Sequence, residues 1–89
     1  MHLDNNAVGE NYGTIKTVPN PANDGIVGVS VQNGAVIKNY GSIIIDGNNN
    51  TGIYLSKGKN EGATPTATNG AVAIQTKKQT DTTKRVAGD

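Results

Sequence analysis

One stretch of this 89-residue chain decides its fold, because most of it occurs twice: Asn33-Gly34-Ala35-Val36-Ile37-Lys38-Asn39-Tyr40-Gly41-Ser42-Ile43. Residues 5–15 match it at 7 of 11 positions, at an offset of 28 residues. The next element recurs as well, since Gly28-Val29-Ser30-Val31 resembles Gly52-Ile53-Tyr54-Leu55 at an offset of 24. Self-similarity at this spacing is typical of repeat architectures, in which each copy stacks on the one before.

Inserts separate the copies. The sequence predicts a third copy of the first element at residues 69–74, displaced by an insert that runs from Ser56 to Thr68. A Pro-rich insert at 19–22 has no counterpart in the second copy, which explains why the offset shortens from 28 to 24. Inserts between strands lengthen loops and leave the stacking intact, so they agree with a repeat architecture.

Hydrophobic residues within the copies alternate with a period of two, which predicts short β-strands. Ile43 and Ile45 share one face while Ile44 points away, and Tyr54 points away from Ile53 and Leu55. The residues expected to fill the interior are Ile15, Val29, Val31, Ile43, Ile45, Ile53, Leu55 and Ile74. The orientation of residues 35–37 stays open, because both the Ala and the Val align with the same residue type in the other copies.

A chain that contributes one strand to each face and returns one rung later places every strand parallel to its copy, about 4.8 Å away. The predicted fold is therefore an all-β parallel β-helix, a solenoid of about two to three rungs. Asn11 and Asn39 stand at the same corner of successive rungs, where Asn tolerates a left-handed backbone. We predict an Asn ladder between them, with an ordinary turn role as the alternative.

Composition excludes several classes of protein. The chain has 12 Gly and 12 Asn but two Leu, which excludes an all-helical fold. It has no Cys, which excludes a disulfide framework, a zinc-thiolate site and a thiol nucleophile. With 8 basic and 7 acidic residues, electrostatic repulsion does not oppose collapse. No apolar run approaches the roughly 18 residues of a membrane-spanning helix, so we expect no membrane insertion by this segment.

The candidate catalytic and metal sites are weak. Asp46-Gly47-Asn48-Asn49-Asn50 resembles the start of an EF-hand loop, but Thr51 and Lys57 stand where that loop needs Gly and Glu, which favours a polar corner turn. The one histidine, His2, lies at the start of the chain. Asp24 and Asp46 could act as paired carboxylates, yet their different spacing from the following strand does not require a shared face. We therefore expect no enzyme activity, no cofactor and no bound metal.

Three segments are expected along the chain. Residues 1–4 form an added or disordered start, residues 5–76 form the β-helix repeats, and residues 77–89 form a polar, basic tail or edge strand. The tail has no aromatic residues to stack on bases, so we expect no binding to nucleic acid. Because a stack of two or three rungs leaves unpaired strand edges at both ends, we expect copies of the chain to associate.

Outward apolar side chains are the candidate contact residues. Val27, Ile44 and Tyr54 are expected on outer faces, and Tyr12 and Tyr40 are expected to stack one rung apart near a corner. Exposed aromatic or aliphatic rows mark contact surfaces. The alternative is that these rows pack against the inserts or against neighbouring chains.

The repeat vocabulary, including Asn-Tyr-Gly-Ser-Ile, residues 47–55 and Asn69-Gly70-Ala71-Val72, resembles the passenger regions of type V autotransporters. The similarity covers about residues 5 to 76 and is greatest to fusobacterial adhesins and vacuolating-cytotoxin-like proteins. It implies a right-handed β-helix that is exported across the bacterial outer membrane by a separate barrel and displayed at the cell surface or secreted.

The expected function is therefore a structural or adhesive segment of a bacterial repeat protein involved in virulence. Its outer faces and loops would meet a host-cell or matrix ligand, either protein or glycan. The alternative is a polysaccharide-binding or polysaccharide-cleaving β-helix, as in phage spikes and lyases.

Overall fold

The computed structural model describes residues 1–17 and 25–77, and the Pro-rich insert, Asp24 and residues 78–89 lie outside this part. The described residues form ten β-strands and no helix, so none of them belongs to a helix that could cross a membrane. The strands are β1 (His2–Leu3), β2 (Val8–Asn11), β3 (Thr14–Lys16), β4 (Val27–Gln32), β5 (Val36–Asn39), β6 (Ser42–Asp46), β7 (Thr51–Ser56), β8 (Lys59–Asn60), β9 (Thr66–Thr68) and β10 (Val72–Thr76).

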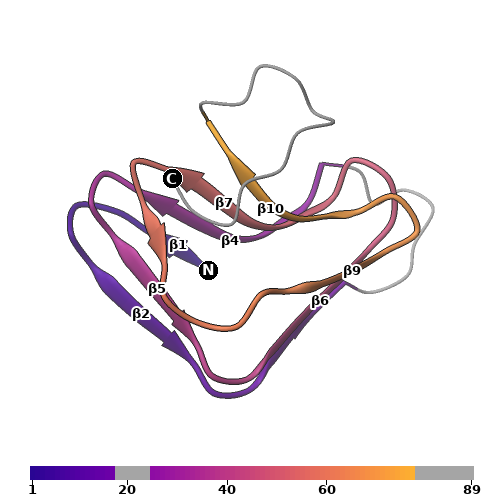
Figure 1. Cartoon of the computed structure of the whole chain (residues 1–89), viewed down its shortest axis with the longest axis horizontal. Helices are drawn as coiled ribbons and strands as arrows, with labels where there is room; N and C mark the ends of the chain where they lie inside the picture. Colours follow the sequence, from indigo (N-terminus) through magenta and orange to yellow (C-terminus); the bar gives the residue numbers. More distant parts are fainter. Residues whose placement is uncertain (18–24, 78–89) are drawn as a thin grey trace.

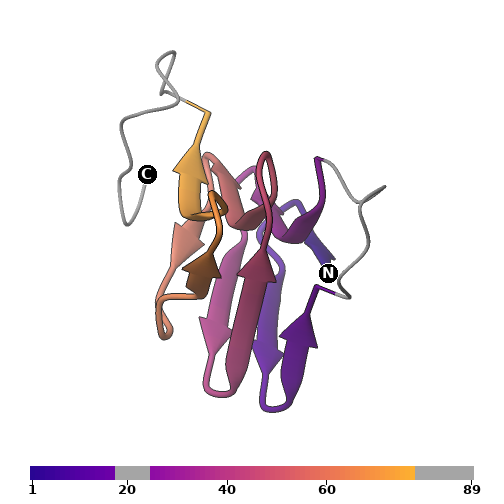
Figure 2. The same ribbon diagram turned by 90° about the vertical axis from the view of Figure 1, so that its right-hand side faces the viewer.

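The strands form three sheets, which the chain visits in a fixed order. Sheet A contains β1, β4, β7 and β10, sheet B contains β2, β5 and β8, and sheet C contains β3, β6 and β9. Every pairing is parallel. Viewed down the shortest axis, the ribbon follows a three-sided outline, and the side view shows successive turns of the chain lying next to one another (Figures 1 and 2). The prediction of an all-β fold with parallel strands is confirmed.

The pairing registers match the two predicted offsets. Val8 pairs with Val36 and Ile15 with Ile43, which are separations of 28 residues. Val29 pairs with Ile53, a separation of 24. The internal repeat therefore correctly predicts that β2 lies beside β5, β3 beside β6 and β4 beside β7.

The predicted third copy is wrong. Residues 69–74 do not extend sheet B, because Val72 pairs with Thr51 and the strand belongs to sheet A. The third position in sheet B is taken by β8, whose Lys59 pairs with Val36. The expected insert between Ser56 and Thr68 thus contains both β8 and β9. The sequence did not predict β8 and β9 because both strands are short and polar. Residues 69–74 were aligned with sheet B because the same Asn-Gly-Ala turn occurs at two different corners, before β5 and before β10.

The first residues of the chain belong to the fold. His2 pairs with Ser30 and Leu3 with Val31, and the Met1 amino group donates a hydrogen bond to the Gly28 carbonyl at 2.8 Å. Because β1 forms one end of sheet A, the disordered alternative for residues 1–4 does not fit the structure, and the alternative of an added start stays a prediction.

The core lies between the three sheets and contains the apolar side chains predicted to face inward. Of the predicted residues, Val29, Val31, Ile43, Ile45, Ile53, Leu55 and Ile74 have almost no exposed surface, and Ala35 and Ile37, whose orientation was left open, are buried with them. Ile15 is half-buried and packs against this cluster. Since Ala35 and Ile37 are buried while Val8 is 60% exposed, the open orientation of residues 35–37 is resolved with Val36 facing outward.

Gly28 marks a break in the alternation of sheet A. A Cβ at this position would lie 2.8 Å from the Gly52 carbonyl oxygen and 3.4 Å from Cδ1 of Ile45, so Gly28 faces the interior at a point of close backbone approach. Val29 is also buried. Val27 therefore lies on the outer side, although it is two residues from Val29.

Candidate functional site

The most exposed aromatic feature is the corner that joins sheet B to sheet C, here called the tyrosine corner (Tyr12 and Tyr40). The two rings are stacked, with centroids 5.1 Å apart and an interplanar angle of 18°. They are 71% and 58% exposed. The Tyr12 hydroxyl donates a hydrogen bond to Oε2 of Glu10 at 3.2 Å. Partial desolvation and this hydrogen bond raise the pKa of Tyr12 above 10.0, so the phenol stays protonated at neutral pH.

A pair of buried asparagines holds the tyrosine corner in place. Asn11 Nδ2 donates a hydrogen bond to Asn39 Oδ1 at 2.9 Å, which is the ladder contact expected from the repeat. Asn11 Oδ1 also accepts a hydrogen bond from the Gly13 amide. Each tyrosine is preceded by one of these asparagines, so the ladder fixes the spacing of the two rings.

The ladder does not rely on a left-handed backbone. The asparagines with positive φ stand at the other two corners and are Asn5, Asn6, Asn33, Asn49 and Asn69. The ladder ends after Asn39, whose Nδ2 next meets the Ala63 carbonyl at 3.5 Å. The ladder asparagines thus stack at one corner, whereas the positive-φ asparagines form turns at the other two.

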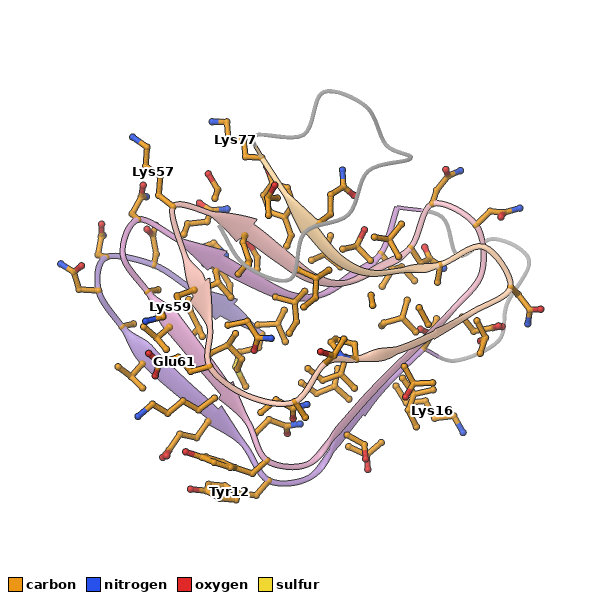
Figure 3. All side chains as sticks on the ribbon, in the orientation of Figure 1. Tyr12, Lys16, Lys57, Lys59, Glu61 and Lys77 are labelled. Atoms are coloured by element: carbon orange, nitrogen blue, oxygen red, sulfur yellow. The ribbon has the colours of Figure 1, made fainter. Side chains whose placement is uncertain are left out.

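The outer face of sheet B continues from the tyrosine corner. Its first column contains Val8, Val36 and Lys59. The column beside it contains Glu10 and Lys38, with Glu61 one turn further on. Lys59 Nζ lies 3.1 Å from Glu61 Oε2, and Figure 3 shows both side chains projecting outward on the side of the molecule that ends at Tyr12.

The other predicted contact residues do not join this surface. Val27 is 44% exposed in sheet A, while Tyr54 and Ile44 are half-buried in sheets A and C. Tyr54 lies between Ser30 and Gln75 in its column. Ile44 lies between Lys16 and Thr66. Neither forms an apolar row, because polar residues flank both.

The corner that joins sheet C to sheet A contains the Asp46 segment. Asp46 Oδ1 accepts hydrogen bonds from Thr68 Oγ1 at 2.7 Å and from Asn69 Nδ2 at 2.5 Å. These two bonds hold the pKa of Asp46 below its ordinary value of 3.8. The carboxylate therefore ties one turn of the chain to the next. Within residues 1–17 and 25–77, no group of three or more His, Cys, Asp and Glu side chains is placed to hold a metal ion.

Sequence reasoning missed Asn50, which is almost fully buried in the same corner. Its Nδ2 donates to the Asp46 carbonyl at 2.9 Å, and its Oδ1 accepts from the Ile26 amide at 2.9 Å. The signal was present, since Asn50 ends a run of three asparagines directly before β7. Asn50 differs from the exposed Asn48 and Asn49 because the Ile26 amide of the preceding turn lies within hydrogen-bond distance of its side chain, which the sequence does not show.

Comparison with known proteins finds no matching family model, no matching curated protein and no matching solved structure. The chemistry of the surface therefore rests on the geometry described above. That geometry combines two stacked phenol rings, a carboxylate bonded to one of them and a neighbouring column of alternating charge.

Proposed function

We propose that this chain is a segment of a right-handed parallel β-helix from a bacterial surface or secreted repeat protein, and that it acts as a structural or adhesive module. The fixed order in which the chain visits the three parallel sheets supports the solenoid. The buried Asn11–Asn39 bond supports regular stacking. The handedness, the export route and the outer-membrane or secreted location follow from the resemblance to autotransporter passengers.

The observation that carries the adhesive role is the exposed stack of Tyr12 and Tyr40. Tyr side chains provide a large apolar area and a polar tip with few rotatable bonds, which is why they are enriched where proteins bind partners. Since the ladder and the ring stacking already order both rings, a ligand meets them at a low cost in conformational entropy. The ligand class is a host-cell or matrix protein or glycan.

Binding, rather than catalysis, is the role we propose. Asp46, the one member of the candidate carboxylate pair in the described part of the chain, already accepts two hydrogen bonds that hold a corner together. The flat Tyr12 ring beside the Glu10 carboxylate also suits a sugar, whose apolar face stacks on an aromatic ring while its hydroxyls donate to the carboxylate. This observation favours the polysaccharide-binding alternative over the polysaccharide-cleaving one.

The test compares a Tyr12→Ser/Tyr40→Ser variant with a Tyr54→Ser control. Tyr54 is half-buried in sheet A, away from the tyrosine corner. Binding of the full chain to an array of matrix proteins and glycans is measured, and far-UV circular dichroism checks that each variant is folded. We expect the double variant to lose most binding and the control to keep it. Unchanged binding by a folded double variant, or no binding by the wild-type chain, contradicts the adhesive role.

We also propose that copies of the chain associate through the ends of the stack. Among the described strands, β2 and β8 stand at the two ends of sheet B. The outer edges of these end strands present backbone N–H and C=O groups that a strand of a second copy can pair with. Light scattering over a range of concentrations tests this, and a strictly monomeric chain across that range contradicts it.

A further inference from the structure

The two Asn-Gly pairs of the chain stand at different corners in the same local conformation. Asn33 and Gly34 have φ angles of 54° and 85°, and Asn69 and Gly70 have φ angles of 52° and 86°. Both pairs are followed by Ala, so their local sequences are alike as well. All four of these residues are exposed to solvent.

The two asparagine side chains are also held in the same way. Asn33 Nδ2 donates to Asp4 Oδ1 at 2.7 Å, and Asn69 Nδ2 donates to Asp46 Oδ1 at 2.5 Å. In both cases the aspartate belongs to the preceding turn of the chain. The chain thus contains a matched pair of Asn-Gly sites, with one serving as a natural control for the other.

The sites differ at the amide of the glycine. The Gly34 amide donates to the Lys57 carbonyl of the next turn at 2.7 Å. No acceptor for the Gly70 amide lies within residues 1–17 and 25–77. The Asp46-Gly47 pair resembles the protected site, because the Gly47 amide donates to the Thr68 carbonyl at 3.1 Å.

This difference matters because the amide of the following residue is the nucleophile in asparagine deamidation. The deprotonated backbone nitrogen attacks Cγ of the asparagine, a C–N bond forms, the bond to Nδ2 breaks and ammonia leaves. Water then opens the resulting succinimide at either carbonyl, giving aspartate or isoaspartate. Glycine favours the reaction because it has no side chain to hinder the attack. A hydrogen bond donated by this amide opposes the reaction, because it holds the amide proton and fixes the peptide plane.

We propose that Asn69-Gly70 is the preferred site of spontaneous deamidation in this chain, with water as the only co-reactant. The modification would replace the amide that donates to Asp46 with a second carboxylate. Like charges at this distance repel, so the corner that joins β9 to β10 would loosen. Isoaspartate would add a further atom to the backbone of a turn that already requires two positive φ angles.

The test incubates the full chain in mildly alkaline buffer and follows both sites by peptide mapping with mass spectrometry and enzymatic methylation of isoaspartate. We expect product at Asn69 to form several-fold faster than at Asn33 in the folded chain, and at equal rates in concentrated urea. Hydrogen exchange should show protection of the Gly34 amide and fast exchange of the Gly70 amide. Equal or faster deamidation at Asn33 in the folded chain, or persistence of the difference in urea, overturns the proposal.

Discussion

Asn11 and Asn39 form a hydrogen bond between equivalent side chains of successive turns, with Nδ2 of the first 2.9 Å from Oδ1 of the second. Both are nearly inaccessible to solvent, with exposed fractions of 9% and 2%. The residue that follows each of them is an exposed tyrosine. A buried polar contact therefore sets the spacing of the surface that we propose for binding.

Replacing Asn39 with Ala should lower the free energy of unfolding by about 0.5–1.5 kcal/mol, because Asn11 Nδ2 would lose its shortest hydrogen bond and keep only the longer ones to the Gly13 and Ser42 carbonyls. Urea denaturation followed by circular dichroism measures the effect. The Asn11→Ala/Asn39→Ala double variant should cost less than the sum of the two single variants, since the two changes share one interaction. Additive costs would show that the two side chains act independently.

Gly41→Ala and Gly13→Ala should differ strongly, although both glycines follow Asn-Tyr. A Cβ on Gly41 would overlap the Gly13 carbonyl oxygen, whereas a Cβ on Gly13 meets nothing within 4 Å. We expect Gly41→Ala to destabilise the chain by about 1–3 kcal/mol and Gly13→Ala to be neutral or stabilising by up to ~1 kcal/mol. Thermal melts of the two variants decide this, and equal midpoints would contradict the stacking.

The orientation of β5 predicts unequal effects at two neighbouring residues. Ile37 has no exposed surface, while Val36 is half-buried on the outer face. Ile37→Ala should therefore cost about 2–5 kcal/mol, and Val36→Thr should stay within ~0.5 kcal/mol of wild type. The reverse order in urea denaturation would mean that the other face of β5 is buried.

Asp46 should make stability depend on pH in the acidic range. Its folded-state pKa lies below the ordinary value of 3.8, because Thr68 and Asn69 donate hydrogen bonds to its carboxylate. The folded state thus binds this proton less readily than the unfolded state. The stabilisation is complete above about pH 4 and is lost as the pH falls through the folded pKa.

Asp46→Asn removes this ionisation and provides the comparison. Above about pH 4 the wild-type chain should melt at a higher temperature than the variant, and the difference should shrink as the pH falls further. A difference that is constant from neutral to strongly acidic pH would assign the stabilisation to a group other than Asp46.

The sequence was informative wherever a strand carries apolar residues. The Val29 and Ile53 alignment predicted their pairing, because equivalent strands in stacked turns need equivalent buried side chains. The third turn was missed where this signal fails, since Lys59–Asn60 and Thr66–Thr68 form β8 and β9 without a large apolar residue. Backbone hydrogen bonds to the strand below define these elements, and such bonds are available to any sequence without proline.

The candidate surface was predicted in part for the same reason. Tyr12 and Tyr40 were expected to stack because they occupy equivalent positions in a repeat, and their rings do stack. Val27, Ile44 and Tyr54 were grouped with them on the basis of facing outward, but they lie on other sheets or are half-buried. Facing outward is a local property of a strand, whereas sharing a surface depends on which sheet each strand joins.

The sequence by itself determined the β class, the parallel stacking at offsets of 28 and 24 residues, and the apolar core of the first two turns. Hydrophobic periodicity lies within one segment, and an internal repeat compares two segments of the same sequence. Both can therefore be recognised without knowing which residues are in contact in the folded chain. Only the tertiary structure decided the third turn, the burial of Asn50 and the hydrogen bond from the Gly34 amide to the Lys57 carbonyl. Each of these features depends on the adjacent turn of the chain. Residues more than 20 positions away in the sequence supply the hydrogen-bond partners and cover the side chains from solvent.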